Sequence, residues 1–125
     1  MEISKQCVGL ELSKKLKKLG VKQDSYFDHI RSYPDKPYSL SGGTWRSDDE
    51  FGRISAFTVA ELGEMLKGWI YECRCGGNVW TITAVNPPSV DKDGKPTYQT
   101  HSANTEADAR AKMLIYLLEN GLCQV

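Results

Sequence analysis

Apolar and polar residues alternate with helical spacing near the N-terminus. Four apolar residues are separated by four, four and three positions, which keeps them on one helix face. They are Val8, Leu12, Leu16 and Leu19. Gly20 follows, and glycine is favoured directly after a helix. The pattern predicts a helix over residues 8–19, whose opposite face carries Lys14, Lys15, Lys17 and Lys18.

A capping sequence predicts a second helix in the middle of the chain. Thr58 precedes Glu61 by three positions, so the hydroxyl and the carboxylate are each placed to bond the other residue's amide. Phe57 and Leu62 flank this capping box, where a hydrophobic staple forms. We expect the helix to end near Gly68.

The C-terminal helix has signals at both ends. Thr105 and Asp108 predict its start, and Gly121 followed by Leu122 is typical of a Schellman closure. Its predicted core stripe consists of Ala107, Ala111, Leu114, Ile115 and Leu118.

Runs of β-branched and aromatic residues predict the strands, at 26–30, 51–57, 69–74, 78–85 and 96–101. Residues 32–49 are rich in proline and glycine and are interpreted as a loop, with a short edge strand near 44–46. The glycines at 76–77 predict a hairpin, and Pro87 and Pro88 are expected to stop the strand before them. Trp80, Ile82 and Ala84 share one strand face, which we expect to face the core.

This order of elements, α-β-(β)-α-β-β-β-α, indicates an α+β fold. We expect an antiparallel sheet of about four or five strands packed with three helices in a sandwich-like arrangement. The 125 residues, 1–125, suit a single domain with its own core.

The net charge and its distribution give limited information about possible binding partners. Sixteen basic and sixteen acidic residues cancel, which argues against a strong polyanion binder. The cancellation is uneven, because residues 1–25 hold six lysines against three acids while residues 26–72 hold five basic against eight acidic residues. The lysines at 14, 15, 17 and 18 therefore remain candidates for nucleic-acid or partner contact, with Tyr26, Phe27, Tyr71 and Trp80 as stacking groups if exposed. The favoured alternative is that the lysines solvate the helix and the aromatic rings fill the core.

Metal and catalytic chemistry have little support in the sequence. Cys73 and Cys75 share a strand face, and His29 and His101 are available, but one Cys-x-Cys lacks the paired spacing of structural zinc sites. Phosphate-loop, zinc-protease, nucleophile-elbow and dinucleotide-binding motifs are absent, and Asp28 and His29 point to opposite strand faces. We predict no catalytic, cofactor-binding or metal-binding residue, no cofactor and no enzyme activity. An unrecognised small enzyme would need a pocket where one of the two cysteines meets one of the two histidines.

Targeting signals are also lacking. The N-terminus has no apolar stretch of signal-peptide length, and no apolar run approaches the roughly 20 residues that cross a bilayer. Four cysteines alone do not indicate an oxidising compartment. We therefore expect a bacterial cytoplasmic protein with reduced thiols and no membrane partner.

The chain resembles a group of small phage- and prophage-encoded proteins of unknown function. The resemblance rests on a lysine-rich helix followed by Asp-Ser-Tyr-Phe over 16–27, the Thr-x-x-Glu-Leu helix within 57–66, an aromatic hairpin, and the closing helix of 104–122. It covers most of the chain except residues 32–50 and 86–100. It implies an ABA-sandwich-like domain and carries no established activity or catalytic residue.

These observations together favour a non-enzymatic, phage-derived accessory domain that acts through protein contacts. The expected partner is a phage or host protein, or a second copy joined through a sheet edge. The alternative is a weak nucleic-acid binder that uses the lysines of the first helix. That alternative gains support if those lysines line a concave face beside exposed aromatic side chains.

Overall fold

The computed structural model describes residues 3–31, 33–42, 53–90, 92–93 and 96–122. Within these residues the chain forms four helices and two three-stranded antiparallel sheets. The helices are α1 (Ile3–Gln6), α2 (Leu10–Lys18), α3 (Val59–Met65) and α4 (Glu106–Glu119). The first sheet has the order β2–β1–β3, from β1 (Phe27–Ile30), β2 (Ser39–Gly42) and β3 (Ile54–Ser55). The second has the order β4–β5–β6, from β4 (Ile70–Gly76), β5 (Val79–Val90) and β6 (Pro96–Ala103).

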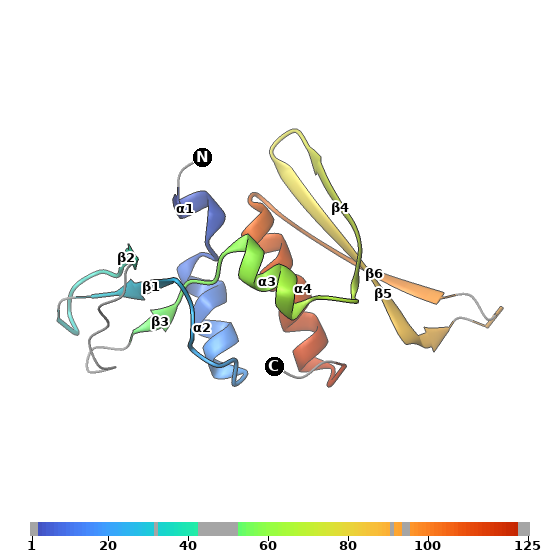
Figure 1. Cartoon of the computed structure of the whole chain (residues 1–125), viewed down its shortest axis with the longest axis horizontal. Coiled ribbons are helices and arrows are strands. Elements are labelled where there is room, and N and C mark those ends of the chain that lie inside the picture. The colour runs from blue at the N-terminus through green and yellow to red at the C-terminus, as the bar shows by residue number, and fades with distance from the viewer. Residues whose placement is uncertain (1–2, 32, 43–52, 91, 94–95, 123–125) are drawn as a thin grey trace.

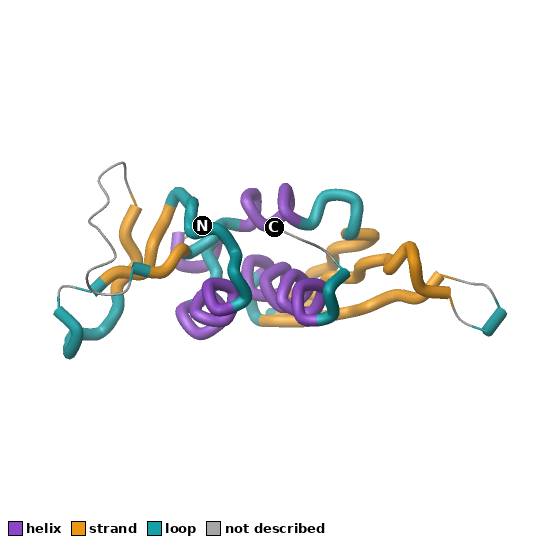
Figure 2. Tube along the Cα trace, turned by 90° about the horizontal axis from the view of Figure 1, so that it is seen from below, coloured by secondary structure: helices purple, strands orange, loops and turns teal. Residues whose placement is uncertain are grey.

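The helices lie between the two sheets (Figures 1 and 2). The α+β class is therefore confirmed, whereas the prediction of one sheet of four or five strands with three helices is wrong. β3 is only two residues long, and the chain then enters α3 before it begins β4. The strands before and after α3 thus pair in separate groups.

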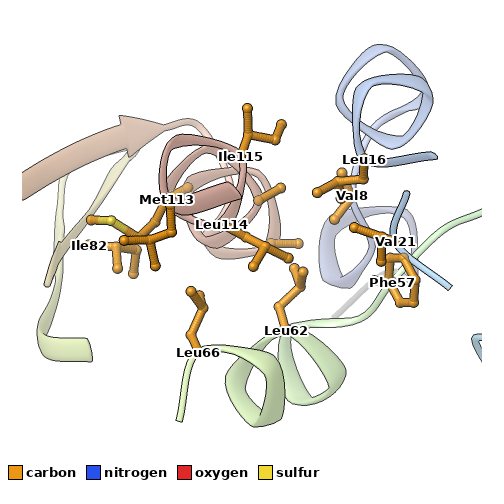
Figure 3. Close-up of a cluster of buried hydrophobic side chains, with 14 of the residues drawn as sticks. Val8, Leu16, Val21, Phe57, Leu62, Leu66, Ile82, Met113, Leu114 and Ile115 are labelled. Atoms are coloured by element: carbon orange, nitrogen blue, oxygen red, sulfur yellow. The ribbon is translucent and has the colours of Figure 1, made fainter. Parts of the chain in front are cut away.

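α4 is the centre of the core. Seven of its residues are buried: Ala107, Ala109, Ala111, Met113, Leu114, Ile115 and Leu117. The helix contacts α2, α3, β5 and β6, so it is buried on more than the single predicted stripe. Figure 3 shows Met113 beside Ile82 of β5, Leu62 and Leu66 below the helix, and Leu16 with Phe57 on the side of α2. Four of the five predicted stripe residues are buried, and Leu118 is half-buried.

The predicted start of α3 and the predicted end of α4 are confirmed, whereas α3 ends at Met65, three residues before the predicted Gly68. Thr58 Oγ1 accepts from the Glu61 amide at 3.2 Å, and Glu61 Oε1 accepts from the Thr58 amide at 2.9 Å. At the end of α4, the Leu122 amide donates to Leu117 O at 2.8 Å and the Gly121 amide to Leu118 O at 3.1 Å, with Gly121 at φ +65°. These bonds form the Schellman pattern.

The N-terminus of α4 is also joined to the start of α2. Thr105 Oγ1 accepts from the Asp108 amide at 3.2 Å, as predicted for a cap. The Asp108 carboxylate accepts from the Gly9 amide at 2.8 Å, and Gly9 is the N-cap of α2. One acidic side chain therefore fixes two helix starts relative to each other.

Other predicted boundaries are corrected as well. Of the strand predicted at 51–57, only Ile54–Ser55 forms a strand within the described residues. The first long helix begins at Leu10 rather than at residue 8, because the Val8 amide donates to Phe57 O at 2.9 Å instead of joining the helix. β2 lies within the segment interpreted as a loop, while the edge strand predicted at 44–46 falls outside the described residues. β5 continues past Pro87 and Pro88, where its register with β6 shifts between Asn86 and Val90. Such an irregularity tolerates residues that cannot donate to the ladder.

Candidate functional site

An open groove lies between the start of β1 and α3. Its volume is about 570 Å³, and its lining consists of Asp24, Ser25, Tyr26, Ala60, Glu61, Glu64 and Met65. Among the described residues that line it, three carry a carboxylate and none is basic. Tyr26 is 72% exposed, more than any other large apolar side chain among the described residues. The groove therefore offers an exposed aromatic ring beside negative charge.

α3 holds the segment that carries Tyr26. The Tyr26 amide donates to Glu61 Oε2 at 3.2 Å, while the other oxygen of the same carboxylate caps α3 at Thr58. Glu61 is therefore already engaged by two amide donors from different parts of the chain. The carboxylates of Asp24 and Glu64 lie on exposed residues and give the groove its outward-facing charge.

A polar network beneath the groove fixes residues 23–28. Ser25 Oγ donates to Phe27 O at 2.6 Å, and the Ala56 amide donates to the same carbonyl at 2.9 Å. The buried Asp28 accepts from Arg53 Nη1 at 2.9 Å.

The same network continues through a glutamine and a lysine. Gln23 Oε1 accepts from the Ser55 amide at 2.8 Å, and its Nε2 donates to Val21 O at 3.0 Å. Lys17 Nζ donates to Arg53 O at 2.9 Å. Because these bonds already hold the backbone around Tyr26, little backbone entropy is left to lose when a partner binds there.

The structure gives the four lysines of α2 different environments. Lys17 is engaged with the carbonyl of Arg53, as described above. Lys14 pairs with Glu11 at 3.6 Å and lies 5.7 Å from the centre of the Tyr38 ring, which Arg31 also covers at 4.7 Å. Lys15 and Lys18 are exposed. The set therefore does not act as one uniform basic face.

The aromatic candidates are divided as well. Phe27 and Trp80 are half-buried, and Trp80 packs against the core cluster. The side chain of Tyr71 lies outside the described part of the structure. Tyr26 is exposed, but it lines the acidic groove rather than a basic surface.

The structure separates the cysteine and histidine candidates. His29 Nε2 lies 2.9 Å from Val8 O in the first sheet, whereas the partner of Asp28 is Arg53. In the second sheet Cys73 and His101 both pair with Ile82, so a buried residue lies between them. Within the described residues, no three His, Cys, Asp or Glu side chains are placed so that they could hold one metal ion.

Two cysteine thiols have raised pKa values. Burial, and secondarily the Glu61 carboxylate, raises the pKa of Cys7 to about 11. Cys73 is exposed, but partial desolvation on the sheet face that carries it still raises its pKa, with Glu106 adding to the shift and Arg110 opposing it. Neither thiol has the lowered pKa that activates a cysteine nucleophile.

Sequence reasoning missed the groove. Its two halves, 24–26 and 60–65, are far apart in the chain, and the sequence pattern around Glu61 predicts only a helix cap. The contact between Tyr26 and Glu61 spans 35 positions, so no local pattern indicates it.

In the part of the chain that the structure describes, no helix is both long and apolar enough to cross a bilayer. The likeness to phage-encoded proteins stays a prediction. Comparison of the chain with protein-family models, with curated proteins and with solved structures finds no match.

Proposed function

We propose that this protein is a non-enzymatic interaction domain that binds a basic segment of another protein in the groove beside Tyr26. The observation that supports the proposal is the pairing of a 72% exposed tyrosine with the acidic lining of that groove. A guanidinium or ammonium group is attracted both to the face of an aromatic ring and to carboxylates. Half-buried Met65 and exposed Ala60 supply apolar contact for the side chain that follows the basic one.

The groove residues have different roles in the proposed binding. Tyr26 provides the anchor, and Asp24 with Glu64 provides the charge. Glu61 acts as a positioning residue because its carboxylate is bonded to the amides of Thr58 and Tyr26. Preformed sites of this kind bind with little reorganisation, so the interface residues need not move to accept the partner.

An NMR titration tests the proposal. The ¹⁵N-labelled protein is titrated with a short peptide of alternating arginine and leucine, and in parallel with one of alternating glutamate and leucine. We expect shift changes at residues 24–26 and 60–65 with the basic peptide only. Tyr26→Ala and Glu64→Gln should each weaken binding about tenfold, as loss of a central contact does.

Tyr33→Ala serves as the matched control, because Tyr33 is 60% exposed and does not line the groove. It should leave the affinity unchanged. Unchanged affinity in Tyr26→Ala, or shifts that map elsewhere, would contradict the proposal.

Nucleic-acid binding is tested in the same experiment with a short oligothymidine strand at low salt. Shifts centred on Lys14, Lys15 and Lys18 that vanish at high salt would instead favour the alternative.

A further inference from the structure

β4 is an open edge of the second sheet. Among the described strands, β5 is its only partner, and the β4–β5 hairpin rises beyond the helices in Figure 1. The hairpin has a two-residue loop, because Gly76 pairs with Val79, and Gly77 has φ +62°. In such a loop the flanking residues form a hydrogen-bonded pair.

This turn determines which backbone groups face outward. Hydrogen-bonded pairs alternate along an antiparallel ladder, so Glu72 and Arg74 bond to β5. The amides and carbonyls of Cys73 and Cys75 then point to the open edge. An edge with unused donors and acceptors is a template for another strand.

The side chains along β4 carry complementary charge. Glu72 and Arg74 lie on the outer sheet face and form an ion pair with each other, with side chains 38% and 79% exposed. Cys73 and Cys75 are free, exposed thiols on the opposite face. Charged side chains on an edge strand normally prevent pairing with another strand. When two opposite charges lie two positions apart, however, a second copy of the strand in antiparallel orientation places each charge opposite its complement.

Charge selects one register for such pairing. If two β4 strands pair antiparallel with Cys73 opposite Cys73, Glu72 of each copy faces Arg74 of the other. These two pairs fall at the non-hydrogen-bonded positions, where side chains approach most closely. Centring the pair on Arg74 instead would place the two arginines directly opposite each other, which is destabilising.

We propose that two copies of this protein associate through their β4 edges, antiparallel and centred on Cys73. The two second sheets then form one continuous sheet, held by backbone hydrogen bonds and two reciprocal ion pairs. The short paired segment makes this a weak, reversible dimer, at the small end of specific interfaces. It is independent of the groove at Tyr26.

Charge reversal tests the proposal directly. We expect concentration-dependent dimerisation of the parent protein in sedimentation velocity. Glu72→Arg and Arg74→Glu should each weaken it about tenfold or more, because attraction becomes repulsion at both pairs. An equimolar mixture of the two variants should recover the dimer, since each strand then faces its charge complement.

Disulfide trapping checks the register. Directly opposite residues in a hydrogen-bonded pair have Cα atoms about 5.5 Å apart, within the range of a disulfide. Glutathione disulfide accepts the two electrons as two Cys73 thiols form one bond, and it leaves as two molecules of glutathione with the two protons. A variant with Cys75→Ser and Cys123→Ser should cross-link at least about tenfold faster than one with Cys73→Ser and Cys123→Ser.

Several outcomes would overturn the proposal. The dimer is ruled out if the parent protein stays monomeric at millimolar concentration. The ion pairs are ruled out if the single charge variants dimerise as the parent does, or if their mixture does not recover the dimer. The register is ruled out if Cys73 and Cys75 cross-link at equal rates. All the substituted side chains in described regions are exposed, and circular dichroism checks that each variant is folded. Peptide binding at Tyr26 is unaffected by either result, so the two proposals fail separately.

Discussion

The two sheets of this protein are stabilised in different ways. The first has strands of four, four and two residues, and its central strand buries Asp28 against Arg53. The second has strands of seven, twelve and eight residues, and its central strand buries Ile82 and Ala84 against α4. The central strand of the first sheet is therefore fixed by a directed polar contact, and the central strand of the second by apolar burial.

This difference explains where the candidate binding site lies. Hydrogen bonds and ion pairs are directional, so the network of Gln23, Ser25, Asp28 and Arg53 holds the backbone on both sides of Tyr26 and leaves the Tyr26 side chain exposed. Apolar side chains are stabilising only when another element covers them, and in the second sheet they are concentrated on the face toward α4. The outer face of that sheet instead carries hydroxyl pairs, Thr81 with Ser102 at 3.0 Å and Thr83 with Thr100 at 3.3 Å.

The largest expected effect comes from the apolar side of the comparison. Ile82→Ala should lower the free energy of unfolding by about 4 kcal/mol, because it removes a fully buried side chain and leaves a cavity beside Met113. Urea denaturation measures it. Thr81→Ala, on the outer face of the same strand, should cost less than about 1 kcal/mol. Equal costs for both variants would show that apolar burial does not dominate in this sheet.

The polar side of the comparison is tested by Asp28→Asn. Removing the charge leaves Arg53 without its carboxylate in a mostly buried position, so we expect a loss of about 3 kcal/mol in urea denaturation. The double variant Asp28→Leu with Arg53→Met should cost less than the single variant, since no charge is then left unpaired. A single variant as stable as the parent protein would mean that this pair does not hold the first sheet.

A smaller effect is expected at the helix caps. Thr58→Ala and Thr105→Ala should each lower the free energy of unfolding by about 1 kcal/mol. Only Thr58→Ala should also weaken peptide binding, because it removes a hydrogen bond to Glu61, which lines the groove. At the other cap, Asp108 bonds to the Gly9 amide and does not line the groove. Equal peptide affinities in the two variants would argue against Glu61 as a positioning residue.

The smallest effect concerns pH and the second sheet. Burial, and secondarily Lys112, lowers the pKa of His101 in the folded protein. The unfolded chain then binds the proton more readily, so stability is complete above about pH 6.5 and declines as pH falls below it. Thermal melts of the parent protein and His101→Gln at pH 7.5 and 5 check this. A parent protein whose pH dependence matches that of the variant would contradict it.

Local signals were predictable and tertiary pairing was not. The capping box at Thr58 and the closure at Gly121 depend on residues within five positions of each other, so the sequence pattern contained all the necessary information. The proline and glycine residues of 32–49 predict a loop, and only the pairing of β2 with β1 makes Ser39–Gly42 a strand. Similarly, the register shift of β5 against β6 accommodates the two prolines.

The sequence by itself determined the α+β class, the three longer helices, the capped start of α3, both ends of α4 and the inward face of β5, because each follows from spacing and side-chain chemistry over a few residues. Only the tertiary structure decided that the strands form two sheets, that α4 is buried on several sides, and that Tyr26 stands exposed beside Glu61. The physical reason is the same in all three cases: these features depend on contacts between segments far apart in the chain, whose energies no local pattern records.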